Sequence, residues 1–122
     1  MPELSRRECW RSMGKTSRDK GARGEREVVA FLRSEGYDAH RGHQLHQKGG
    51  ADNPDVLALP GIHIEVKRTE AFRMEDAMAQ AHADCGDRMP TVWHRRNNGR
   101  WRVIMEATDW IQLYRAWEVS RE

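Results

Sequence analysis

The sequence predicts an α/β domain in which helices flank a mixed central sheet. Apolar residues recur at helical spacing in two well separated segments, 25–32 and 74–85. Strict alternation of apolar and polar residues over Ile62–Lys67 predicts a strand. A turn-forming run at 97–100, Asn-Asn-Gly-Arg, predicts a hairpin because Asn and Gly tolerate positive φ. The elements follow in the order helix, three strands, helix, two strands, helix, which predicts a sheet covered by helices.

The first helix is predicted from Ser17 to the C-terminal turn at Gly36. Its stripe follows the spacing i, i+3, i+4, i+7 with residues Glu25, Val28, Val29 and Leu32. The preceding residues show no periodicity. We therefore expect a flexible basic leader over 1–17 and a single domain over 18–122.

Three strands are expected next, at Tyr37–His43, Val56–Leu59 and Ile62–Lys67. A polar, glycine-containing loop, Gln44–Asn53, separates the first two, and Pro60-Gly61 marks a turn before the third. A second helix is predicted over Ala71–Cys85.

Two further strands, Pro90–Arg96 and Trp101–Glu106, flank the hairpin turn. A last helix carries an apolar stripe of Trp110, Leu113, Tyr114 and Trp117. Trp110 and Trp117 are expected either in the core or at a subunit contact.

The composition indicates one domain of 122 residues, with 33% charged and 38% hydrophobic side chains. No run of about 18 apolar residues is present, so we expect neither a membrane-spanning helix nor a secretory signal. Two distant cysteines exclude a disulfide framework and favour a reducing cytoplasm. The first 24 residues carry a net charge of +4 and the remainder −2, which suits a polyanionic partner or, alternatively, a solvated tail.

The alternating strand carries the most informative chemistry. Its apolar residues face one side, whereas His63, Glu65 and Lys67 share the other, with neighbours on one face about 7 Å apart. Asp55 follows Pro54 at the start of the neighbouring strand, and we expect it to lie beside Glu65. Two adjacent carboxylates repel each other unless a cation lies between them, and hard oxygen ligands suit Mg²⁺ or Mn²⁺. A third acid, Glu25, lies on the predicted buried stripe of the first helix, where a carboxylate needs a partner or a metal.

These residues resemble a known family. Pro54-Asp55, followed after nine residues by Glu65-Val66-Lys67, resembles the PD-(D/E)xK nuclease signature. The segment 20–27, Lys-Gly-Ala-Arg-Gly-Glu-Arg-Glu, resembles the N-terminal helix of archaeal-type Holliday-junction resolvases and their small bacteriophage relatives. The resemblance extends from roughly Ser17 to Trp117. It implies a restriction-endonuclease-like αβββαβ core and a Mg²⁺-dependent endonuclease that acts on four-way DNA junctions as a homodimer. It also implies that the reducing cytoplasm is that of a bacterium or a phage-infected host.

The resemblance also implies roles for single residues. Asp55, Glu65 and the Val66 carbonyl would bind the metal, Glu25 would bind it directly or through water, and Lys67 would orient the attacking water or stabilise charge on the phosphate. Gln80, in the following helix, would support the site. The DNA-binding residues expected near it are Lys20, Arg23, Arg41, Lys48 and Arg68. Gly49-Gly50-Ala51 departs from the family pattern, which usually has a serine in this loop.

Several alternative interpretations stay open at this stage. Glu65 and Lys67 taken alone would fit a simple ion pair on a half-exposed strand. Four residues, His40, His43, His46 and His63, have no assigned role, and a zinc site is not expected from their spacing. The arginines near the hairpin tip, Arg95, Arg96, Arg100 and Arg102, fit either a second phosphate-binding edge or a solvated turn. For the whole chain, the alternatives are a nuclease for nicked, branched or duplex DNA, or a non-catalytic DNA-binding module.

Overall fold

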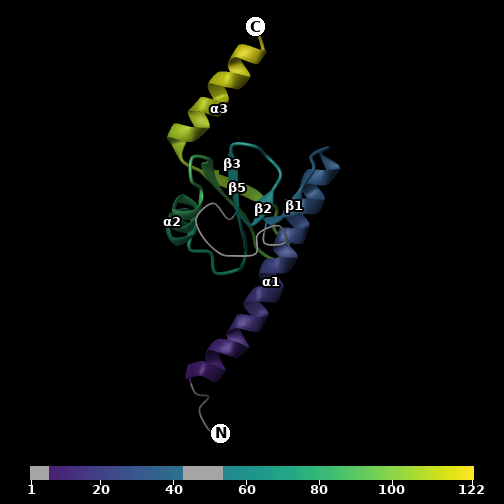
Figure 1. The fold of residues 1–122 in the computed structure, drawn as a ribbon, viewed down its shortest axis with the longest axis vertical. Coiled ribbons are helices and arrows are strands. Elements are labelled where there is room, and N and C mark those ends of the chain that lie inside the picture. Colours follow the sequence, from purple (N-terminus) through teal and green to yellow (C-terminus); the bar gives the residue numbers. More distant parts are fainter. Residues whose placement is uncertain (1–5, 43–53) are drawn as a thin grey trace.

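A computed structural model describes residues 6–42 and 54–122 of the chain, with side chains described from Lys20 onward. The elements are α1 Arg6–Ser34, β1 His40–Arg41, β2 Val56–Leu57, β3 Ile62–Arg68, α2 Met74–Asp84, β4 Met89–Arg95, β5 Arg102–Met105 and α3 Ala107–Ser120. Their order confirms the predicted αβββαβ core with a hairpin strand and a C-terminal helix added (Figure 1).

The five strands form one mixed sheet in the order β1-β2-β3-β4-β5. Strands β3 and β4 run parallel, from the pair Ile62–Met89 to the pair Arg68–Arg95, and the other neighbours are antiparallel. Parallel strands require a crossover connection, which α2 supplies. The C-terminal ends of β3 and β4 therefore meet at the same edge of the sheet.

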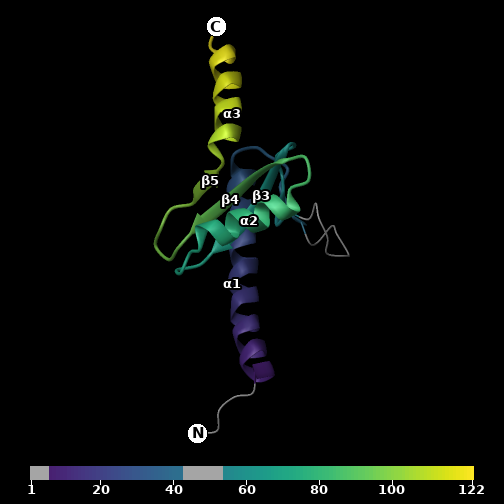
Figure 2. The ribbon, with the colours of Figure 1, turned by 90° about the vertical axis from the view of Figure 1, so that its left-hand side faces the viewer.

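Helices α1 and α2 cover opposite faces of the sheet (Figure 2). The core on the α1 side contains Val28, Val29, Leu32, Ala39, Val56, Ile64, Val66 and Trp93. The smaller core on the α2 side contains Ala77, Met78, Ala81 and Val92. The predicted alternation of β3 is thus confirmed, because its apolar residues face α1 while Glu65 and Lys67 face α2.

Helix α1 begins earlier than the sequence indicated, at Arg6 instead of near Ser17. Residues 6–16, expected to belong to a flexible leader, are helical. No proline interrupts this segment, and once the packed C-terminal half is formed, favourable helix formers such as Arg, Lys and Glu extend the helix without a new nucleus. The predicted C-terminal end is confirmed: Gly36 adopts φ +95°, and the Tyr37 N–H donates to the Leu32 carbonyl at 3.0 Å.

The other elements lie where they were expected but are mostly shorter. Strands β1 and β2 contain two residues each, because the turn after α1 and the Pro60-Gly61 turn occupy the rest. Helix α2 begins at Met74, three residues after the expected Ala71. The hairpin turn is confirmed, with Asn98 at φ 60° and the Gly99 N–H donating to the Arg96 carbonyl at 2.9 Å.

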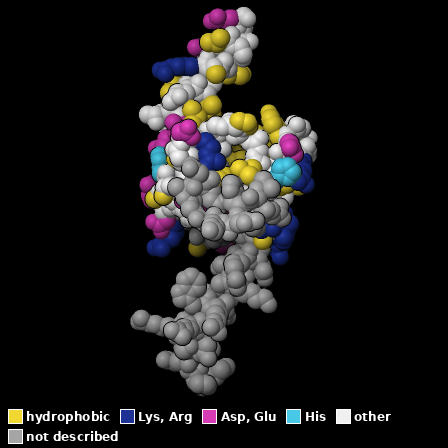
Figure 3. Space-filling view, viewed as in Figure 1, with side chains coloured by type: hydrophobic (Ala, Val, Ile, Leu, Met, Phe, Trp, Pro, Cys, Tyr) yellow, Lys and Arg dark blue, Asp and Glu magenta, His cyan; other side chains and the backbone are white. Residues whose placement is uncertain are grey.

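Helix α3 projects from the body, and none of its residues is buried (Figures 1 and 3). Trp110 and Trp117 are 53% and 51% exposed, so they are not core residues. Tyr114 lies between them, with ring centroids 5.6 Å from Trp110 and 5.5 Å from Trp117. Within the described residues, no helix has the length and apolar character needed to cross a membrane.

Candidate active site

Asp55 is fixed at the start of β2 by two backbone contacts with β3. Its N–H donates to the Ile64 carbonyl at 3.0 Å, and its Oδ2 accepts the Val66 N–H at 2.8 Å. Because Val66 lies next to Glu65 in the chain, this pairing brings the two carboxyl groups together, and their side chains share a hydrogen bond. The convergence expected from the sequence is therefore present in the structure.

Glu65 is held on the α2 side of the sheet by a buried histidine. His63 Nε2 lies 3.1 Å from Glu65 Oε1, and the side chains are 0% and 4% exposed. The Thr91 hydroxyl donates to the His63 carbonyl at 2.7 Å, which ties this part of β3 to β4. Among the described residues, His63 Nδ1 has no hydrogen-bond partner. Glu65 therefore pairs with His63 and Asp55, not with Lys67 as the simple ion-pair interpretation required.

Glu25 reaches the same region from α1 and pairs with Arg41 on β1. Both Nε and Nη2 of Arg41 lie 3.0 Å from Glu25 Oε1, with side-chain exposures of 16% for Arg41 and 14% for Glu25. The positive charge of Arg41 offsets the desolvation cost of placing the Glu25 carboxylate on the buried side of a helix. Arg41 was expected to contact DNA, and here its guanidinium is turned toward an acidic residue of the site.

The electrostatics of Asp55 reflect this crowding. Burial, and next the neighbouring Glu65 carboxylate, raise the pKa of Asp55 to about 8; Glu25 raises it further, while the Val66 N–H opposes the shift. A carboxyl group with such a pKa is largely protonated at neutral pH, and it donates a hydrogen bond where a second carboxylate would repel it. Protonation of Asp55 relieves the repulsion that an ionised Asp55 would feel from Glu65 and Glu25, and a bound cation would relieve it in the same way.

Lys67 and Gln80 meet on the α2 side of the sheet. Lys67 Nζ donates to Gln80 Oε1 at 3.3 Å. Both side chains line a cavity of about 220 Å³ that Phe72 and Asp76 also border. This bond places the ammonium group at the end of β3, two residues beyond Glu65 on the same strand face.

The donor set fits a divalent metal of the hard type, although the site is not preassembled. Carboxylate and carbonyl oxygens from Asp55, Glu65 and Val66 are the ligand types that Mg²⁺ and Mn²⁺ prefer. Across residues 6–42 and 54–122, no three His, Cys, Asp or Glu side chains are arranged to enclose an ion as they stand. The carboxylates are not arranged around an ion because each already has a partner: His63 for Glu65, Arg41 for Glu25 and the Val66 N–H for Asp55. The raised pKa of Asp55 shows the charge that a cation would compensate.

The expected DNA-binding residues lie in different environments. Arg23 is exposed on α1 and Lys20 is half-buried there. Arg68 is buried beneath α1, 9% exposed, with Nε 3.6 Å from Glu27 Oε2, so it does not present the solvent-facing contact that was expected. Its place on the apolar face of β3 explains this burial. Lys48, together with His43, His46 and the Gly49–Ala51 segment, lies outside the described residues.

Two glycines that the sequence analysis did not single out position the site. A Cβ on Gly24 would lie 2.6 Å from Arg68 Cβ, so glycine lets α1 approach β3 closely enough for Glu25 to reach the sheet. A Cβ on Gly42 would lie 1.8 Å from the Pro54 carbonyl oxygen. The Gly42 N–H donates to the Asp55 carbonyl at 2.8 Å, which anchors the backbone of the candidate catalytic aspartate. The sequence signal for the close approach of α1 to β3 was the glycine directly before Glu25.

An αβββαβ core with an aspartate at β2, an acid and a lysine on β3, and an acid on α1 defines the restriction-endonuclease-like class of nuclease folds. The profile of one family, described as archaeal Holliday junction resolvase (hjc), matches residues 16–77, which is half of the chain. The chain belongs to this family, whose members are junction-resolving endonucleases that generally depend on divalent metals. The matched segment includes Glu25, Asp55, Glu65 and Lys67 but ends before Gln80 and the hairpin. No curated protein and no solved structure matched the chain.

Proposed function

We propose that this protein is a metal-dependent endonuclease that resolves four-way DNA junctions by hydrolysing phosphodiester bonds. The observation that carries the proposal is the convergence of Asp55, Glu65 and Glu25 at one end of β2 and β3, with Lys67 on the same strand as Glu65. Family membership supplies the substrate class. A non-catalytic binding module gains nothing from acids gathered near phosphates, because their charge would oppose DNA binding.

Asp55, Glu65 and the Val66 carbonyl are proposed to hold Mg²⁺, for which Mn²⁺ can substitute, and Glu25 is proposed to bind directly or through water. Mg²⁺ in such a site supplies Lewis-acid polarisation of a phosphate oxygen and activation of water near neutral pH. His63 keeps the Glu65 carboxylate aimed at this position through the 3.1 Å contact. Arg41 holds Glu25 in place from the other side.

Lys67 is proposed as the catalytic cation. Its ammonium group, oriented by Gln80, would hold the attacking water or offset the negative charge that develops on the phosphate. Lys67→Ala is therefore expected to abolish cleavage while largely preserving junction binding. An equal loss of binding would make Lys67 a phosphate anchor and would contradict the catalytic assignment.

A resolvase must cut two opposed strands, so we propose that the chain acts as a twofold homodimer with two sites. The exposed stripe on α3, formed by Trp110, Leu113, Tyr114 and Trp117, is the surface proposed for the second copy to cover. A helix of this length is marginal in water without packing, and large exposed apolar patches mark interaction sites.

The decisive experiment compares a labelled four-way junction with a linear duplex of the same arm sequence. Each DNA is incubated with the protein in Mg²⁺ and in EDTA, with Asp55→Asn as the inactive control. Paired symmetric cuts in the junction alone, lost in EDTA and in the variant, are the expected result. Equal cutting of both DNAs would retain the nuclease but reject junction specificity. Tight binding without cutting would identify a non-catalytic DNA-binding module.

A further inference from the structure

A row of basic side chains continues from Lys67 across the neighbouring strands. In the parallel pair, Lys67 lies opposite His94 of β4, and His94 in turn lies opposite Arg102 of β5. Partners in register share a face of the sheet, and Arg96 falls on that face by alternation, two residues after His94. The row therefore lies on the α2 side of the sheet, the side that carries Glu65 and Lys67.

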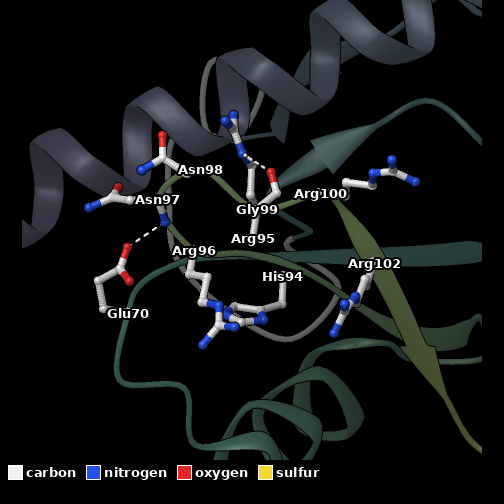
Figure 4. A pocket seen from close by; sticks show the side chains of 9 residues that line it. All are labelled: Glu70, His94, Arg95, Arg96, Asn97, Asn98, Gly99, Arg100 and Arg102. Atoms are coloured by element: carbon white, nitrogen blue, oxygen red, sulfur yellow. Dashed lines mark hydrogen bonds between the residues drawn. The ribbon is translucent and has the colours of Figure 1, made fainter.

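Beyond Lys67, the row consists of His94, Arg96 and Arg102, and these three residues line a polar cavity of about 390 Å³ at the hairpin between β4 and β5 (Figure 4). Glu70 is the one acid among the residues that line it, and its carboxylate accepts the Asn97 N–H. Arg96 and Arg102 are exposed, and within the described part of the chain neither makes an ion pair or a side-chain hydrogen bond. The cavity therefore has an excess of positive charge, because four arginines and one acid line it.

Arg95 differs from Arg96 and Arg102 because its side chain has partners within the protein. Its side chain points to the α1 side, where Nε donates to the Gly99 carbonyl at 2.8 Å and Nη1 to Glu27 Oε2 at 3.0 Å (Figure 4). Arg95 is therefore used to fold the hairpin and dock it on α1. His94 is also fixed, because its ring stacks on Phe72 with centroids 3.9 Å apart and its Nε2 contacts the Thr69 carbonyl at 2.9 Å. The contacts of Arg95 and His94 hold in place the backbone that carries Arg96 and positions Arg102 opposite His94.

We infer that the hairpin row, Arg96 and Arg102 beside His94, binds a DNA-backbone phosphate adjacent to the one placed at Lys67. The inference rests on the proposed function for the scissile phosphate. Two strand spacings separate Lys67 from Arg102, about 10 Å along the sheet, so a second phosphate group can occupy the row while the first lies at the site. The planar guanidinium fork matches two phosphate oxygens at once. His94, Arg96 and Arg102 lie outside the segment matched by the family profile, which ends at residue 77.

The test measures junction binding by fluorescence anisotropy in EDTA, so that cleavage does not interfere. The variants are Arg96→Gln and Arg102→Gln, with Arg115→Gln on α3 as the charge-matched control. Each hairpin variant is expected to weaken binding about tenfold at low salt, and to reduce the slope of log affinity against log salt by about 0.9, the value for one lost phosphate contact. The control is expected to change neither quantity by a comparable amount.

Phosphate-ethylation interference then locates the contact. The wild-type protein is expected to show interference at the scissile phosphate and at a neighbouring one, and Arg96→Gln should lose the neighbouring signal alone. The inference is overturned if both hairpin variants bind with the affinity and salt slope of Arg115→Gln, or if the interference pattern is unchanged. Failure of the wild-type protein to bind any DNA would instead reject the proposed function, and the two failures are therefore distinct. Circular dichroism of each variant confirms that the fold is retained.

Discussion

Gln80 Oε1 accepts a hydrogen bond from Lys67 Nζ at 3.3 Å, across the gap between α2 and the end of β3. The contact joins a strand residue within the family match to a helix residue beyond it. A lysine ammonium on a four-carbon stem has many rotamers, and a hydrogen bond to one acceptor restricts them. We therefore propose Gln80 as a positioning residue for Lys67.

Removing this acceptor should lower the rate of cleavage without changing DNA affinity. We expect Gln80→Ala to reduce the single-turnover rate about tenfold, the usual scale for an outer-shell partner, with binding in EDTA unaltered. Gln80→Glu keeps an acceptor oxygen and should restore most of the rate. Gln112→Ala, on α3, is the matched control because that exposed side chain donates to the Thr108 carbonyl of its own helix, at 3.4 Å. Equal rates for Gln80→Ala and the control would show that Lys67 does not depend on this contact.

Asp55 should make the metal-free protein less stable as the pH rises. Its pKa is about 8 in the folded chain against an ordinary value of 3.8, so the folded state holds a proton that the unfolded state has released. The stabilisation from this protonated group is complete below about pH 4 and is lost progressively until the pH has passed 8. The melting temperature in EDTA should therefore be lower at pH 8 than at pH 5.

Asp55→Asn should remove most of this dependence. The amide reproduces the protonated carboxyl group, since its oxygen can accept the Val66 N–H and its nitrogen can donate to Glu65. We expect the variant to melt at a higher temperature than wild type at pH 8 in EDTA, yet to gain nothing from added Mg²⁺, whereas wild type should gain. A variant that melts with the same pH dependence as wild type would show that Asp55 is not the titrating group.

The parts of the site that depend on neighbouring residues in the sequence could be predicted, and the parts that depend on distant contacts could not. Alternation along β3 fixed the faces of Glu65 and Lys67, and the order of short strands placed Asp55 beside Glu65, because both depend on neighbours in the sequence. Arg68 was expected to bind DNA, but the same alternation puts it on the α1 face of β3, where it is buried. The Arg41–Glu25 pair joins α1 to β1, and a tertiary contact of that kind leaves no periodic signal.

The extent of the helices was predicted less well than their existence. An apolar stripe marks the packed half of α1, whereas its first residues, Arg6–Thr16, show no helical periodicity from which a helix could be predicted. Helix α3 carries a stripe as regular as that of α1, but the structure leaves it exposed. Apolar periodicity therefore predicts which face of a helix favours burial, but it does not predict which part of the protein or of a partner covers that face.

Gly24 should be among the least replaceable residues of α1. A methyl group at this position would lie 2.6 Å from Arg68 Cβ and 3.2 Å from Val66 Cγ1, so Gly24→Ala must push the helix away from β3. We expect a loss of about 1–3 kcal/mol in the free energy of unfolding, measured by urea denaturation. Gly21→Ala is the control, since a Cβ there meets nothing within 4 Å and should stabilise the helix by about 0.5–1 kcal/mol. A stabilising Gly24→Ala would mean that α1 does not pack this closely.

The aromatic stripe of α3 should decide the oligomeric state. Trp110 stacks on Tyr114, Tyr114 contacts Trp117 at a tilted angle, and the three residues are 38–53% exposed. A charge placed on this surface is costly once a second copy covers it. We expect sedimentation equilibrium to give a dimer for wild type and a monomer for Trp117→Glu. Arg115→Glu changes charge on the other side of the same helix and should remain dimeric. The monomeric variant should nick junctions on one strand where wild type makes paired cuts; a Trp117→Glu protein that stays dimeric would place the subunit contact elsewhere.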